Sequence, residues 1–135
     1  MSGTVIQPPG WPPARGYANG IVATGRVLAI AGQVGWTPAG VFEAKDLLGQ
    51  FDQALANVRA VLDAAGGQPE DVIRMTIYVT DLPAYRAGVK GLGPIWRRHF
   101  GRHYPAMALV GVTGLVEPEA LVEIETTAVL PEETP

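Results

Sequence analysis

Hydrophobic residues recur at steps of three and four along the stretch from Asp46 to Ala65, and polar residues fall between them. This spacing predicts an amphipathic helix. Asp46 is suited to the N-cap, and Gly66-Gly67 supplies the left-handed residue with which helices commonly end. We therefore expect one helix over 46–65 with its apolar stripe against a core.

A second helical region is expected between Asp81 and Phe100. Asp81 is a cap residue, and Pro83 follows it at a position suited to a first helical turn. Glycines and Pro94 interrupt the segment, so the sequence predicts a short turn at 83–87, a kink, and a firmer helix at 94–100.

Alternation of apolar and polar residues predicts strands over Val72–Thr80 and Leu121–Leu130. In the second of these, Glu123 and Glu125 share the face opposite the apolar residues. Two further segments, 17–23 and 27–31, are separated by Thr24-Gly25-Arg26 and are expected to form a hairpin.

The run from Ala106 to Val112 is apolar throughout and is short enough for a strand. We expect this strand to be buried on both faces. Pro105 lacks an amide hydrogen and suits the first position of the strand, which fixes where the segment enters the sheet. Function is expected near this entry.

The order strand, strand, helix, strand, helix, strand, strand predicts an α+β fold with a mixed sheet and both helices on one face. No helix remains for the other face. We expect another copy of the chain to cover it, which places pockets between subunits.

Composition narrows the class of protein. The 135 residues fit a single domain, 1–135, with a proline-rich arm at 1–16 and a frayed tail at 131–135. The net charge of −3 and the lack of a basic stripe argue against a nucleic-acid partner. There is no cysteine, no export signal and no long apolar span, so we expect a cytoplasmic protein without membrane contact.

Several short segments in this order resemble the reactive intermediate deaminase (Rid, or YjgF) family, over roughly Ala14 to Leu130. They are Ile30-Ala31-Gly32-Gln33, Asp81-Leu82, Tyr104-Pro105-Ala106 and Leu121-Val122-Glu123-Ile124-Glu125. The resemblance implies a chorismate-mutase-like fold, a homotrimer with clefts at the subunit boundaries, and no cofactor. It also implies hydrolysis of enamines or imines to ammonia and a 2-oxo acid.

The resemblance assigns roles to particular positions. Tyr17 matches a tyrosine that lines the cleft, and Glu123 matches a glutamate that orients the attacking water. Met107 stands where the family has an arginine that binds the substrate carboxylate, and Ala31, before Gly32, stands where it has a serine. An asparagine of the family falls near Gly91. Methionine cannot hold a carboxylate, so a substrate other than the usual 2-imino acids is expected.

Simpler interpretations stay open for these residues. Met107 either fills a gap in the core or forms a pocket wall, and Glu123 is either structural or catalytic. Trp36 either lines a ligand cleft or covers the sheet edge, and a place at the subunit boundary is favoured. Glu125 is expected to be structural, paired with an arginine. The alternatives to an imine hydrolase are a non-catalytic trimer that binds an apolar or aromatic ligand and, third, a ribonuclease.

His99 and His103 are four residues apart, but Gly101 lies between them and no third ligand is evident, so no metal site is expected. Arg97, Arg98 and Arg102 are interpreted as a solvated basic face.

Overall fold

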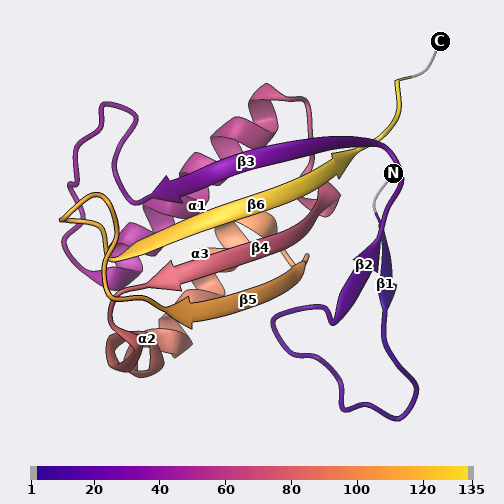
Figure 1. The fold of residues 1–135 in the computed structure, drawn as a ribbon, viewed down its shortest axis with the longest axis horizontal. Helices are drawn as coiled ribbons and strands as arrows, with labels where there is room; N and C mark the ends of the chain where they lie inside the picture. Colours follow the sequence, from indigo (N-terminus) through magenta and orange to yellow (C-terminus); the bar gives the residue numbers. More distant parts are fainter. Residues whose placement is uncertain (1–2, 134–135) are drawn as a thin grey trace.

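The computed structural model describes residues 3–133 and consists of a main sheet, helices on one of its faces, and a small two-stranded arm (Figure 1). The elements in chain order are β1 (Thr4–Ile6), β2 (Gly20–Val22), β3 (Arg26–Val34), α1 (Leu47–Ala64), β4 (Val72–Val79), α2 (Leu82–Gly88), α3 (Leu92–Phe100), β5 (Ala106–Gly111) and β6 (Val122–Leu130). Short 3-10 turns occupy Pro69–Asp71 and Val89–Gly91.

The main sheet has the order β3-β6-β4-β5. β4 and β5 are parallel, joined through α2 and α3, and the other neighbours are antiparallel. Helices α1 and α3 cover one face, as Figure 1 shows behind the strands. The expected mixed sheet with two helices on one face is confirmed.

Helix α1 follows its sequence signals closely. The Asp46 carboxylate accepts a hydrogen bond from the Gly49 N–H, and Gly66 adopts a φ of 78° just beyond the last turn. The apolar stripe lies against β3 and β6, where Leu55, Val58 and Leu62 are fully buried. The second helical region also appears, although α3 begins at Leu92, ahead of Pro94. Proline is tolerated there because it stands in the first turn.

Gln50 on α1 connects the helix to two loops. Its Nε2 donates to the carbonyl oxygens of Ala44 (3.2 Å) and Glu119 (2.9 Å), and its Oε1 accepts from the Leu121 N–H (2.7 Å). The side chain is 1% exposed. These loops precede α1 and β6, so one buried amide fixes where both elements begin.

Replacing Gln50 by leucine should therefore be costly. We expect Gln50→Leu to lower the free energy of unfolding by about 2–4 kcal/mol, because three backbone groups lose their buried partner. Urea denaturation at one protein concentration measures the change. Gln33→Leu is the control, since within residues 3–133 its half-buried side chain bonds only to the Ala31 carbonyl; equal losses in the two variants would contradict this account.

Within the chain, the strand after Pro105 is covered on one face only, and cover of its other face by another copy stays a prediction. β5 lies at the edge of the sheet, and Ala108, Val110 and Gly111 are exposed. Met107 and Leu109 face the helices because they pair with Met75 and Ile77, whose side chains are in the core. The strand is thus covered on one face within the chain, and β4 and β6 occupy the centre.

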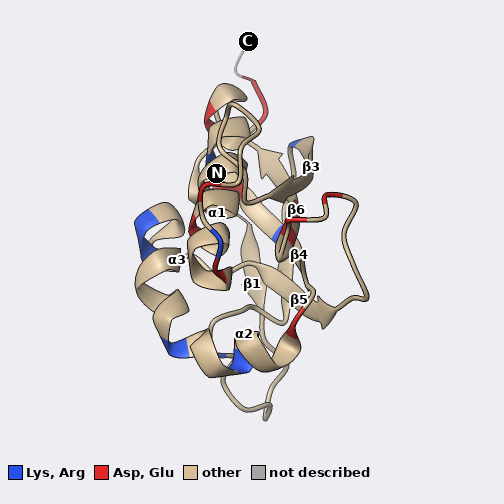
Figure 2. Ribbon diagram, turned by 90° about the vertical axis from the view of Figure 1, so that its left-hand side faces the viewer, with Lys and Arg blue, Asp and Glu red and all other residues tan. Residues whose placement is uncertain are grey.

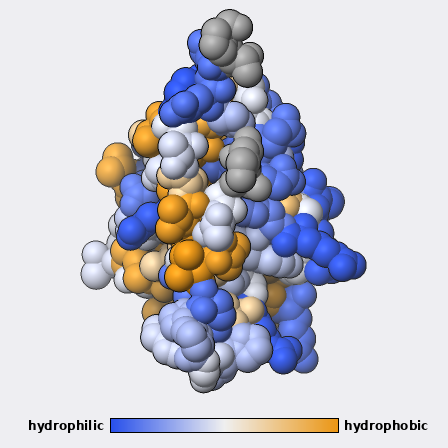
Figure 3. All heavy atoms as spheres, turned by 90° about the vertical axis from the view of Figure 1, so that its right-hand side faces the viewer, coloured by the Kyte–Doolittle hydropathy of each residue, from blue (hydrophilic) through white to orange (hydrophobic). Residues whose placement is uncertain are grey.

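The expected hairpin over 17–31 is wrong, because its two strands do not pair with each other. β2 pairs with β1, a strand that the sequence did not suggest, and β3 pairs with β6. Thr24-Gly25 therefore carries the chain from the arm into the main sheet. Figure 3 shows the side of the molecule that carries the arm, with apolar surface gathered in its middle; Val5, Ile6 and Val22 of the arm are exposed.

The ends of the described chain are held by few contacts. Arg26 donates to the Pro131 carbonyl (3.2 Å) and pairs with Glu133 (3.5 Å), so residues 131–133 are attached to β3. The rest of the predicted frayed tail and residues 1–2 of the arm lie outside the described residues. Within 3–133, no helix has the length and apolar character to cross a lipid bilayer.

Candidate functional site

The segment before β2 is attached to the entry of β5. The Ala18 N–H donates to the Pro105 carbonyl (3.0 Å), and Ala18 forms a parallel bridge with Ala106. This contact places Tyr17 beside Met107 at the edge of the sheet, and both residues line the same pocket. The sequence expectation that function would lie near Pro105 thus coincides with a pocket.

The pocket has a volume of about 420 Å³ and lies between β5, α1 and the α2–α3 region. Aromatic residues form much of its wall: Tyr17, Phe51, Tyr85, Trp96 and Tyr104. Aliphatic side chains and Met107 supply most of the remainder: Leu55, Ile77, Val89, Leu92 and Leu109. Arg15 is the one charged residue along this lining. Met107 is therefore a pocket wall that also packs on the core, so its two sequence interpretations are compatible.

The aromatic walls are held firmly. Trp96 stacks on Tyr104 with ring centroids 5.7 Å apart and planes at 12°, and its Nε1–H donates to the His103 carbonyl (2.9 Å). Phe51 and Tyr85 form a second pair at 6.4 Å. Burial raises the pKa of the Tyr85 phenol, so it is protonated at neutral pH. The walls thus favour a flat apolar group.

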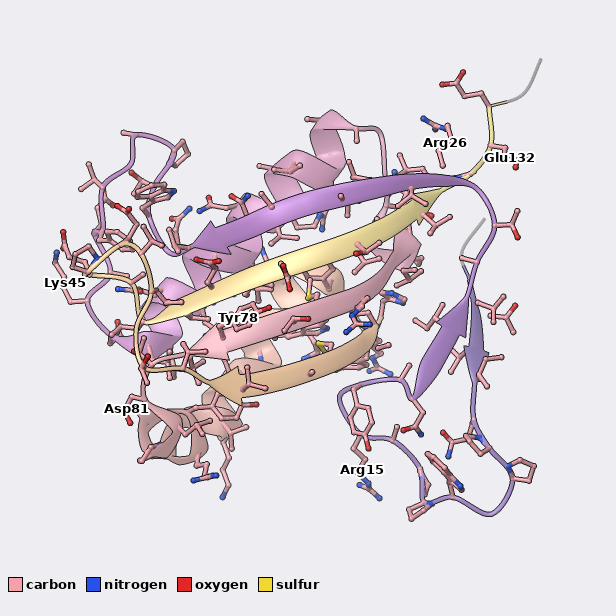
Figure 4. The ribbon with its side chains drawn as sticks, in the orientation of Figure 1. Arg15, Arg26, Lys45, Tyr78, Asp81 and Glu132 are labelled. Carbon is pink, nitrogen blue, oxygen red and sulfur yellow. The ribbon has the colours of Figure 1, made fainter. Side chains whose placement is uncertain are left out.

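Glu123 lies on the opposite face of the sheet, which the helices leave open. It pairs across β6 and β4 with Tyr78, which Figure 4 shows on the open face. Gly32 lies directly against it: a Cβ at Gly32 would come 2.3 Å from Glu123 Oε2. Among residues 3–133, no hydrogen bond or ion pair engages the Glu123 carboxylate. The half-buried carboxylate is therefore available to a ligand or a water molecule.

Glu125 has a different environment. The Tyr78 hydroxyl donates to Glu125 Oε1 at 2.6 Å, and this bond raises the pKa of the Tyr78 phenol, with the negative charges of Glu125 and Glu123 acting in the same direction. The expected arginine partner is replaced by a tyrosine. Glu125 is thus tied to its neighbour, while Glu123 on the same face is free of such a bond.

The structure separates the residues that the sequence grouped in one site. Tyr17 and Met107 are at the helix-side pocket, whereas Glu123, Ala31 and Gly32 are on the open face. Trp36 belongs to neither group. It packs on Phe42 at 5.7 Å in a small cluster with Val34, Leu115 and Ala120.

The two histidines also have separate partners. His99 Nε2 lies 2.6 Å from Asp52 Oδ1, and Arg98 pairs with the same carboxylate at 3.2 Å. His103 Nε2 lies 2.6 Å from the Val72 carbonyl. Within the described part of the chain, no three histidine, aspartate or glutamate side chains come together as metal ligands would.

Sequence reasoning missed most of the pocket wall. Phe51, Tyr85, Trp96 and Tyr104 come from four different segments, and no single motif joins them. Tyr104, directly before Pro105, and Trp96 in the helical segment ahead of it were the available signal. Arg15 was missed because it lies within a proline-rich stretch.

Comparison with known proteins identifies the family of this chain. The family described as Endoribonuclease L-PSP matches residues 10–130. A RutC family protein of Pyrococcus horikoshii is 34% identical over 113 residues, which cover 83% of this chain and 85% of that protein. The crystal structure of YyfB, a Rid family protein of Yersinia pestis, superimposes with a TM-score of 0.84 at 38% identity, covering 96% of this chain and all (100%) of that one.

The YjgF gene product of E. coli superimposes with a TM-score of 0.68 at 32% identity, over 84% of this chain and 87% of that one. Both superpositions cover more than four-fifths of this chain. The chain is therefore a member of the Endoribonuclease L-PSP family, to which the Rid and YjgF proteins belong.

Proposed function

We propose that this protein is a hydrolase that releases ammonia from a small reactive imine or enamine, in the cytoplasm, at seams between the subunits of a homotrimer. One observation carries the proposal: the pocket beside Tyr17 and the carboxylate of Glu123 lie on opposite faces of the sheet of one chain. Each is half of a site. A second copy, with its open face against the edge of β5, would bring its Glu123 to the first copy's pocket.

The open face supports such a contact. Its described surface includes small and apolar side chains from several strands, among them Ala31, Ala108 and Val110, all of which are exposed in the single chain. No element within residues 3–133 covers this face. Burial of such a surface against another subunit is favourable, and closed rings of identical subunits produce one seam per interface.

The chemistry needs a group that moves protons next to an apolar binding surface. Water adds to the carbon of the protonated C=N bond while the Glu123 carboxylate takes one of the water protons, which gives a neutral carbinolamine. The carboxylic acid then returns this proton to the nitrogen of the carbinolamine. As the C–N bond breaks, the carboxylate takes the hydroxyl proton, so ammonia leaves and a carbonyl group remains. Tyr17 lines the pocket, and its hydroxyl would donate a hydrogen bond to the substrate.

Met107 explains why the usual 2-imino acids are not expected as substrates. Its thioether cannot pair with a carboxylate, and its neighbours Leu109 and Ile77 add no donor. A carboxylate pushed against this wall would lose its hydration without compensation. The substrate should therefore present an apolar group to the wall.

Met107→Arg tests this explanation. With imines generated by an amino acid dehydratase from small hydroxy amino acids, the variant should have a kcat/KM for ammonia release roughly tenfold or more above that of the wild type, because a bidentate pair is regained. Met107→Leu, which adds no charge, is the control and should resemble the wild type. Failure of a folded Met107→Arg protein to gain activity would contradict the assignment of Met107 to the carboxylate position.

A non-catalytic trimer that binds an aromatic ligand is the second candidate, and the aromatic walls of the pocket favour it. Whether the protein is a hydrolase or a non-catalytic binder, its melting temperature would rise as the ligand concentration increases. Only the hydrolase would also release ammonia. Ribonuclease activity is a third and weaker candidate, because the chain carries a net charge of −3.

A further inference from the structure

We infer that Arg15 is the anion-binding residue of the pocket and that the ligand is a carboxylic acid with an aromatic or bulky apolar body. The inference rests on the proposed function for the location of the site and adds the chemical class of its ligand. In this arrangement the ring enters the pocket, and the carboxylate stays at the mouth.

The pocket favours this orientation. Its depth is lined by buried apolar side chains, including Phe51, Leu55 and Trp96. The indole N–H of Trp96 is already bonded to the His103 carbonyl, so this wall offers no donor to an anion. A cavity of about 420 Å³ accommodates a single aromatic ring with its substituents. An acid could bury its ring here only if its charged end remained near the exposed Arg15.

Unpaired positive charge surrounds the mouth. Tyr17 lines two further hollows, one with Arg102 and one with Arg74, and neither hollow nor the main pocket has an aspartate or glutamate on its lining. Across residues 3–133, Arg15, Arg74 and Arg102 form no ion pair with a carboxylate. Figure 2 shows further basic segments on α2 and α3. In a chain with a net charge of −3, this local excess favours an anion at the mouth.

Arg15 is held in place by its loop. Asn19 donates to the Gln7 side chain (2.8 Å), and the Gln7 amide donates to the Pro12 carbonyl (3.1 Å), which closes the loop across its base. Four prolines at 8, 9, 12 and 13 restrict the same segment. The Ala18 bond to Pro105 ties its far end to β5. Figure 4 shows Arg15 on this loop, beyond the edge of β5.

The position of the charge decides which acids fit. An arginine at position 107 would stand on the wall and draw a carboxylate inward. Arg15 instead is an exposed residue of the lining, whereas Phe51 and Trp96 in the same lining are buried. The pocket thus binds the apolar end of its ligand in its buried part and selects against acids with small side chains.

Calorimetric titration with 3-phenylpropionate and its neutral analogue 3-phenylpropanamide tests the inference. We expect the wild type to bind the acid about fivefold more tightly than the amide, the effect of one partly exposed charge pair. Arg15→Ala should abolish this preference and keep the affinity for the amide. Arg26→Ala, which removes an exposed arginine near the C-terminus, should keep the preference (Figure 4).

Equal binding of acid and amide by the wild type, an unchanged preference in Arg15→Ala, or no binding of either probe would overturn the inference. A different result would refute the proposed function. Preference for the acid without any imine turnover would refute the hydrolase and leave the role of Arg15 intact, whereas turnover without the preference would refute the role of Arg15 alone.

Discussion

Glu123→Gln should lower kcat for imine hydrolysis by roughly 10²- to 10⁴-fold, the usual contribution of a general acid or base. Glutamine has nearly the shape of glutamate but cannot take a proton from water. Since no hydrogen bond or ion pair within residues 3–133 engages the Glu123 side chain, the substitution should leave the fold intact. Ammonia release under saturating substrate measures the loss, and circular dichroism checks the fold.

The control for Glu123→Gln is Glu125→Gln. Glu125 lies on the same face and is bonded to Tyr78, so its substitution removes an equal charge from the same surface. That variant should retain activity. Gly32→Ala offers an independent disturbance, because the added Cβ would displace the Glu123 carboxylate, while Gly114→Ala has no neighbour to disturb. Comparable losses in Glu125→Gln and Glu123→Gln would remove the assignment of Glu123 as the proton-transfer group.

Phe100→Ala should have the largest effect on stability. Phe100 is 2% exposed and stacks on Trp96 with centroids 4.9 Å apart. Removing its ring leaves a cavity at the end of α3, and we expect the free energy of unfolding to fall by about 3–5 kcal/mol. Chemical denaturation at fixed protein concentration measures it.

Val116→Ala is the matched truncation on the surface, since Val116 is 92% exposed. Its effect should stay within about 0.5 kcal/mol. If Phe100→Ala were equally mild, the packing of α3 on the sheet would contribute far less than its burial indicates. Pocket binding should also weaken in Phe100→Ala, because Trp96 would lose the ring that supports it from behind.

Local patterns were sufficient for the elements that pack one face on the core. The periodic apolar positions of α1 and the alternation of β4 and β6 describe surfaces that are half buried, and the structure matches them. Caps at Asp46 and Asp81 were readable because their signals lie within a few residues. In these cases the sequence contained the whole explanation.

Pairing between distant segments could not be read in the same way. The apolar run after Pro105 indicated a covered strand, but its place at the sheet edge depends on which strands it pairs with. Thr24-Gly25-Arg26 has the composition of a hairpin turn, yet β2 finds its partner in β1. Long-range contacts of this kind leave no local signature.

The candidate site was predictable only where a resemblance supplied the residues. Tyr17 and Met107 do share a pocket, and Gly32 does contact Glu123. Trp36 lies elsewhere, in the cluster with Phe42, because an aromatic residue in a glycine-rich loop gives no indication of which surface it covers. Arg15 had no motif, and its position depends on the loop that brings it to β5.

The placement of Met107 and Glu123 on opposite faces of one sheet has an evolutionary consequence. Within a chain these side chains share no contact, so a substitution that reshapes the wall beneath β5 is expected to leave the packing around Glu123 of the same chain undisturbed, and the two side chains would meet only across the proposed seam. Descendants of such a scaffold could adopt new ligands one mutation at a time while inheriting the same reaction. Related proteins could then accept different substrates while the reaction mechanism stayed the same.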